Sequence, residues 1–252
     1  MAVDVVPSLL EAINNGYRGR AEEDKRLIKV NNRIRDGTAT LADVHTYAER
    51  HGIALSNAFL SEIRADTLPN GELYYNIANR VVVPFMQDVY DVVNVAASDV
   101  QRSIDKRVGI GINPVHADFP QKRIDGLIDK LTEPGQDLID RLKWLDEPVV
   151  NNAEAFFDDF VAENAETRAN LGFKTTVTRI IAPGCCSWCA EIAGTFEYGK
   201  EPKDIYRRHE HCRCVVTFDS ERGSQDVWSK KIWQSSPEEL ATRRTIGLQL
   251  RR

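Results

Sequence analysis

The chain lacks the features that would direct it into or across a membrane. No apolar run in its 252 residues approaches the roughly 18 residues that a membrane-spanning helix requires. The N-terminal stretch MAVDVVPSLLEA contains Asp4 and no basic segment, so it does not predict a secretion signal. We therefore expect a soluble protein with no membrane partner, made and kept in a reducing cytosol.

A strongly basic segment is missing as well. The net charge is −5, to which residues 1–171 contribute −9 and residues 172–252 contribute +4. A mildly basic C-terminal part permits contact with nucleic acid, but a dedicated DNA-binding protein is usually far more basic. The charge by itself therefore indicates no particular partner.

Cysteine is absent from most of the chain. All five cysteines fall inside one 30-residue window, at positions Cys185, Cys186, Cys189, Cys212 and Cys214. In a reducing compartment, clustered cysteines are more often metal ligands or redox thiols than structural disulfides. This window is therefore where we expect the chemistry of the protein.

The first 172 residues predict a helical body. Ser8 with Glu11 indicates a capping box at the start of the first helix. Thr40 is the expected N-cap of a later helix, and Gly52 is expected to end it.

The second half of this body has the clearest helical periodicity. Apolar residues recur along one face through residues 85–104, and Pro84 either begins or kinks that helix. Further helices are expected over residues 124–131, 138–145 and 149–170.

The residue composition changes from helix-forming to strand-forming after Gly172. Three short segments with strand-forming residues indicate β-strands over residues 173–182, 194–199 and 212–218. We therefore predict a mainly α fold. In it, a long helical N-terminal body (1–172) is followed by a small α+β module with a Cys/His zinc knuckle (173–218) and a C-terminal tail (219–252).

The spacing of thiols and imidazoles in the window predicts a structural Zn²⁺ site. A C-x-x-C turn can supply two thiolates, and an H-x-x-C-x-C segment further on can supply the remaining ligands. Structural zinc takes four such ligands at tetrahedral corners. The candidate ligands are Cys186, Cys189, His209, Cys212 and Cys214. Cys185 and His211 are further donors close by, so the spacing does not single out one set of four.

Three other interpretations of the window compete with structural zinc. The cysteines can be buried free thiols, or the C-x-x-C can be a redox pair, although Gly194 leaves little room for the helix that a thioredoxin-like motif needs. A catalytic zinc would need an open coordination position and a general base, for which Glu191 and Glu210 are nearby. The order of the motifs is the reverse of that in zinc deaminases.

At these residues the chain resembles the minor head proteins of tailed bacteriophages, the Mu F-like head-morphogenesis family. That family has a strand, a C-x-x-C, a glycine a few residues on, a variable stretch, and H-x-x-C-R-C leading into a strand. The matching residues here are Cys186, Cys189, Gly194, His209, Cys212, Arg213 and Cys214. The motif covers about 30 residues, and the helical region before it resembles the family more loosely. Unlike the family, this chain has no prolines flanking the histidine, and Cys185 is an additional thiol.

The resemblance implies a non-enzymatic minor structural protein of the phage head. Such proteins are present in few copies, associate with the portal vertex and lie in the head interior, having been made in the host cytoplasm. They act in head assembly or DNA delivery. The implied partners are the portal protein, the major capsid or scaffold protein, and packaged DNA.

Two alternative functions stay open beside this one. A metal-dependent nucleic-acid enzyme would use Glu191 or Glu210 as its base. A zinc-containing DNA-binding module would place Arg207, Arg208 and Arg213 against phosphates.

Overall fold

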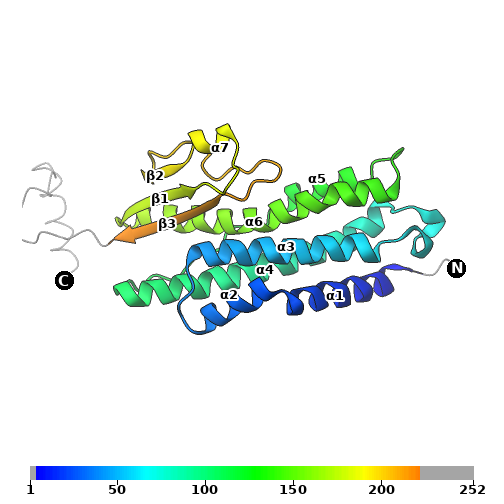
Figure 1. Ribbon diagram of the computed structural model, residues 1–252, viewed down its shortest axis with the longest axis horizontal. Coiled ribbons are helices and arrows are strands. Elements are labelled where there is room, and N and C mark those ends of the chain that lie inside the picture. The colour runs from blue at the N-terminus through cyan, green and yellow to red at the C-terminus, as the bar shows by residue number, and fades with distance from the viewer. Residues whose placement is uncertain (1–3, 222–252) are drawn as a thin grey trace, which may run out of the picture. The chain divides into compact units, whose positions relative to one another are not determined.

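Long helices packed side by side form the N-terminal body in the computed structural model, which describes residues 4–221 (Figure 1). The helices are α1 (Val6–Glu23), α2 (Lys25–Arg35), α3 (Leu41–Glu62), α4 (Tyr75–Val108), α5 (Gln121–Leu131) and α6 (Leu138–Asn170). Two short 3₁₀ turns, Ala65–Thr67 and Pro69–Gly71, connect α3 to α4. The predicted tail lies outside the described residues from position 222 onward. None of the helices in the described part is both long and apolar enough to cross a membrane.

The predicted capping box at Ser8 is wrong. Helix α1 begins at Val6, and the Ser8 hydroxyl donates to the Val5 carbonyl from inside the first turn. Pro7 explains the earlier start, because proline has a helix-compatible φ and its missing N–H costs nothing in the first turn. The Asp4 side chain accepts a hydrogen bond from the Val6 amide at 3.2 Å.

The beginning of α3 is confirmed, but its predicted end is wrong. Thr40 is the N-cap and forms a capping box with Asp43. Gly52 does not end the helix, which continues to Glu62. A Cβ atom at Gly52 would lie only 2.8 Å from the Cα of Val150 on α6. The glycine therefore serves a close helix–helix approach.

Two prolines lie inside long helices instead of at their ends. Pro84 is within α4, which begins nine residues earlier at Tyr75. Pro148 is within α6, so the two helices predicted over 138–145 and 149–170 are one continuous helix. Packing on α3 and α4 along its length explains why α6 tolerates the lost backbone hydrogen bond.

A three-stranded antiparallel sheet with strand order β2-β1-β3 lies against α6 (Figure 1). Its elements are β1 (Lys174–Ile180), the short helix α7 (Ser187–Glu191), β2 (Gly194–Glu197) and β3 (Val215–Glu221). The small sheet after the helical body is as predicted. However, β3 begins at Val215, so Cys212 and Cys214 precede the strand instead of lying in it.

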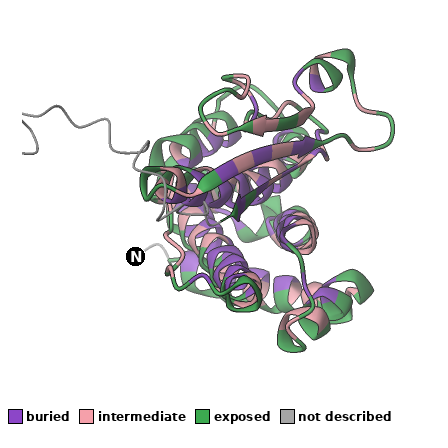
Figure 2. Ribbon diagram, turned by 90° about the vertical axis from the view of Figure 1, so that its left-hand side faces the viewer, coloured by how far each residue is buried: buried purple, intermediate pink, exposed green. Residues whose placement is uncertain are grey.

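The sheet and the helices share one apolar core. Val177 of β1 and Val216 and Phe218 of β3 pack with the same buried cluster as Phe156 and Phe160 of α6. Buried residues line the surfaces where the helices and the sheet face one another (Figure 2). The predicted α+β module therefore packs against the helical body and shares its hydrophobic core.

The close approach at Gly52 leads to a first prediction. Gly52→Ala should lower the free energy of unfolding by about 1–3 kcal/mol, because the added methyl group meets the backbone of α6 and the helices must separate. Chemical denaturation followed by circular dichroism measures the change.

Gly19→Ala is the matched control, since Gly19 also lies inside a helix but has open space around it. It should raise stability by about 0.5–1 kcal/mol, as alanine is the better helix former. Stabilisation by both substitutions would contradict the proposed role of Gly52.

Candidate metal centre

The first half of the site is a turn that follows β1 directly. The Cys185 amide donates to the Ala182 carbonyl at 3.1 Å, and Gly184 takes a left-handed conformation with φ +77°. Cys186 is the N-cap of α7, and its sulfur accepts the Cys189 amide at 3.4 Å. Both thiols of the C-x-x-C therefore face the same side of the turn, as predicted.

The second half is the loop that leads from β2 into β3. The Cys212 amide donates to the His209 carbonyl at 3.1 Å, which closes a tight turn. His211, inside this turn, has φ +58°, a conformation that non-glycine residues rarely adopt. Its amide donates to the Glu147 carboxylate of α6 at 2.8 Å. The helical body therefore holds the turn that presents His209 and Cys212.

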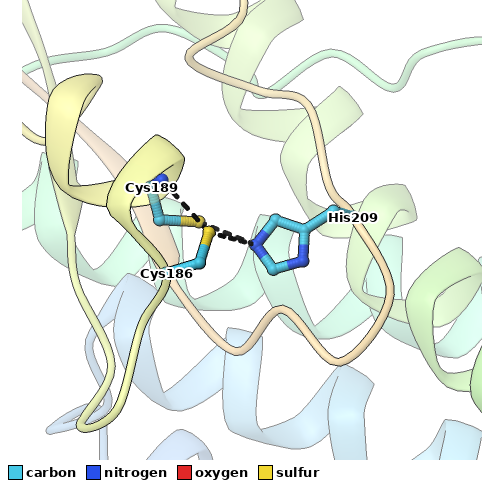
Figure 3. A group of neighbouring side chains, drawn as sticks. All are labelled: Cys186, Cys189 and His209. Carbon is cyan, nitrogen blue, oxygen red and sulfur yellow. Dashed lines mark hydrogen bonds between the residues drawn. The ribbon is translucent and has the colours of Figure 1, made fainter.

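The two halves meet in a cluster of sulfur and imidazole donors (Figure 3). The Nε2 atom of His209 lies 3.2 Å from Cys186 Sγ and 3.1 Å from Cys189 Sγ. Cys189 Sγ lies 3.7 Å from Cys212 Sγ. A tetrahedral zinc with bonds of about 2.3 Å to sulfur would separate two thiolates by about 3.8 Å. The spacing of the donors therefore fits such an ion.

All five predicted ligands are brought together. Their donor atoms form two groups, each within 4.8 Å: Cys186, Cys189 and His209, and Cys189, Cys212 and Cys214. Cys189 links the groups. Cys185 and His211, the further donors noted in the sequence, belong to neither.

The chemistry of the donors also fits a metal. Burial raises the pKa of the Cys189 thiol to about 12, so a cation is needed to hold it as a thiolate at neutral pH. The His209 Nδ1 atom lies 2.6 Å from the Glu210 carbonyl, which fixes the ring so that Nε2 faces the sulfurs. The residues can therefore hold a metal ion.

Arg179 is part of this site and was missed in the sequence. It comes from β1, where Thr175, Val177 and Arg179 alternate on the buried face. Its guanidinium donates to Cys189 Sγ at 3.6 Å and to Cys212 Sγ at 3.4 Å. The period-two pattern of the strand was the available signal, because it places Arg179 on the same face as Val177.

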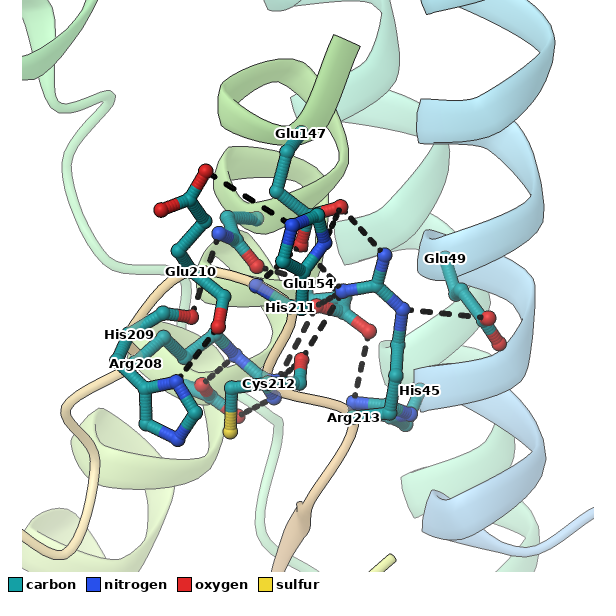
Figure 4. Close-up of polar contacts among 12 residues, drawn as sticks. His45, Glu49, Glu147, Glu154, Arg208, His209, Glu210, His211, Cys212 and Arg213 are labelled. Carbon is teal, nitrogen blue, oxygen red and sulfur yellow. Dashed lines mark hydrogen bonds and ion pairs between the residues drawn. The ribbon is translucent and has the colours of Figure 1, made fainter. Parts of the chain in front are cut away.

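Two arginines beside the ligands bind the loop to α6 (Figure 4). Arg208 donates to the buried Asp158 at 2.9 Å, and Arg213 donates to Glu147 at 2.8 and 2.9 Å. Both arginines also lie near the Glu154 carboxylate, at 3.2 and 3.5 Å. These side chains are therefore engaged with the helical body.

The other residues considered for catalysis or phosphate contact lie on the surface. Arg207 is exposed and pairs with Asp204 at 3.2 Å. Glu191 is exposed at the end of α7. The Glu210 carboxylate lies 3.8 Å from the His211 ring.

Glu154 is a fully buried carboxyl of this network. Burial raises its pKa to about 8, against the opposing effect of Arg208 and Arg213. Its Oε1 atom lies 3.5 Å from the Nε2 of His45, whose pKa is held well below the ordinary range by burial. At neutral pH Glu154 is therefore protonated and the neighbouring His45 is neutral.

No family model, curated protein or solved structure matches this chain.

The elevated pKa of Glu154 gives a second prediction. Between about pH 5 and 8 the folded protein holds a proton on Glu154 that the unfolded chain releases. Its contribution to the free energy of unfolding therefore falls as pH rises, by up to about 1.4 kcal/mol per unit. Glu154→Gln mimics the protonated group, so its stability relative to the wild type should increase across this window. Urea denaturation at each pH measures that difference.

Glu163→Gln, on the exposed side of the same helix, is the control. It should leave the pH dependence of the wild type unchanged. A constant difference between Glu154→Gln and the wild type from pH 5 to 8 would show that Glu154 is ionised in the folded protein.

Proposed function

We propose that this chain is a non-enzymatic minor structural protein of a tailed-phage head, associated with the portal and the capsid interior. It would act in head assembly or DNA delivery. The observation that carries the proposal is that the donors of the C-x-x-C and of the H-x-x-C-R-C come together in one cluster. The C-x-x-C follows strand β1 and the H-x-x-C-R-C precedes strand β3, which is the order of the family's pattern. A structural zinc ion is part of the proposal.

The remaining motif residues support the resemblance because each has a structural role. Gly194 begins β2 with φ +140°, and a Cβ atom there would lie 3.1 Å from the Phe196 ring. Arg213 connects the metal loop to Glu147 of α6.

A structural role for the metal is favoured over a catalytic one. Four thiols and one imidazole lie in two groups that share Cys189, and zinc needs only four such donors. Catalytic zinc keeps one position open for water or substrate. Of the two candidate bases, the Glu210 carboxylate lies 3.8 Å from the His211 ring and Glu191 is exposed at the end of α7. These observations support the structural protein over the metal-dependent enzyme.

The DNA-binding alternative also receives less support. Of the three arginines that would contact phosphates, Arg208 is buried against Asp158 and Arg213 is paired with Glu147. Only Arg207 presents an exposed guanidinium. A single exposed arginine supplies too little charge for a phosphate-binding surface.

The metal part of the proposal gives a third prediction. Protein purified without added metal should contain about one zinc ion per chain, and the thiols that bind this ion should react only after chelation. Cys189→Ser should abolish zinc retention, because Cys189 belongs to both groups of ligands. Hydrogen exchange should then increase over residues 173–221 while α3 and α4 stay protected.

Cys185→Ser is the control, since Cys185 lies outside both groups. It should keep the zinc and the exchange pattern of the wild type. Metal-free protein with the same protection over 173–221 would contradict a structural zinc.

The location in the particle gives a fourth prediction. Purified virions from a genome that encodes this chain should contain it in few copies, at the ratio of a portal-associated protein, by quantitative mass spectrometry. An early stop codon in its reading frame should reduce the yield of infectious particles. Virions that lack the protein would refute the proposed role even if the zinc site is real.

A further inference from the structure

Arg179 differs from the other deeply buried arginines of the described chain in its partners. Arg141, Arg168 and Arg208 are each paired with a carboxylate. Arg179 is only 2% exposed, yet its hydrogen bonds go to two cysteine sulfurs and to the Ile205 carbonyl. The groups that accept hydrogen bonds from this buried guanidinium are therefore all neutral whenever the cysteines are protonated.

A buried cation without a compensating negative charge is strongly unfavourable. A metal-bound cluster would supply that charge, because metal ligands bind as thiolates. Zinc held by three thiolates and one imidazole has a net charge of about −1, which matches the single positive charge of Arg179. The Trp188 ring adds a cation–π contact, with its centroid 5.7 Å from the guanidinium carbon.

We infer that Arg179 is the counter-ion of a thiolate metal centre, a positioning residue that donates to the sulfurs of Cys189 and Cys212 when they hold the ion. This inference rests on the metal part of the proposed function and not on the virion role. Two ligands from distant parts of the chain share the same guanidinium. Arg179 therefore favours the arrangement in which the two halves of the site face each other.

Arg179 has opposite effects on the metal-bound and the metal-free forms of the protein. In the metal-bound form Arg179 is neutralised and stabilises the thiolates. In the metal-free form the same guanidinium is a buried charge with no directly paired carboxylate among the described residues, and only the longer-range attraction of Asp158 acts on it. Arg179→Met, which keeps much of the side-chain volume, should lower metal affinity by about 10- to 100-fold, as expected for loss of a group that supports the ligands. It should leave the melting temperature of the metal-free protein unchanged or higher.

The experiment uses the full chain. Affinity is measured by competing a chromophoric chelator for Zn²⁺, and the sulfur-to-metal absorption of the Co²⁺-substituted protein reports whether thiolates coordinate. Thermal unfolding is followed with and without metal. Arg179→Lys keeps the charge and loses the two-pronged geometry, so it should bind Zn²⁺ more tightly than Arg179→Met and less tightly than the wild type.

Arg168→Met is the control, because Arg168 is equally buried but is paired with Asp105. It should destabilise the metal-free and metal-bound proteins alike and leave the Zn²⁺ affinity unchanged. If Arg179→Met behaves in this way, Arg179 is only a packing residue and the inference fails.

The remaining outcomes are also decisive. Unchanged Zn²⁺ affinity in a folded Arg179→Met protein would overturn the inference while leaving the metal centre intact. If Arg179→Met does not fold, Arg179→Lys with wild-type affinity would overturn it in the same way. Wild-type protein that binds neither Zn²⁺ nor Co²⁺ would refute the metal centre itself, and the inference with it.

Discussion

Charge compensation between α6 and the loop that joins β2 to β3 is the constraint on which the C-terminal half of the structure depends. Arg208 enters this interface and bonds the buried Asp158, while Arg213 bonds Glu147 at its edge. Removing one partner from a buried ion pair leaves the other uncompensated, at a cost of about 3–5 kcal/mol. The loop that carries the two arginines therefore has one strongly preferred position on the helices.

This constraint reaches the metal ligands through the chain itself. In the loop, Arg208 precedes His209 and Arg213 follows Cys212, so each of these ligands is adjacent to a residue anchored on α6. Arg179 connects the cluster to strand β1 of the sheet. Binding of an ion and docking of the sheet would therefore stabilise each other, as expected where folding assembles the ligands.

The same arrangement supports the proposed role in assembly. The deeply buried polar groups support the packing of the sheet on the helices, and α4, of 34 residues, keeps exposed residues along its length. In the proposed phage-head role, the metal would secure the small sheet while the helices provide the area for contact with other head proteins.

The sequence by itself determined the local features: the helical body, the three-stranded sheet after it, and the set of candidate ligands. Periodicity and the spacing of cysteines and histidine suffice for these, since each depends on neighbouring residues. Only the tertiary structure decided that Gly52 lies in the contact of α3 with α6, that α6 continues through Pro148, and that Arg179 faces two thiols. These outcomes depend on groups brought together from distant positions, where packing and charge compensation override local propensity.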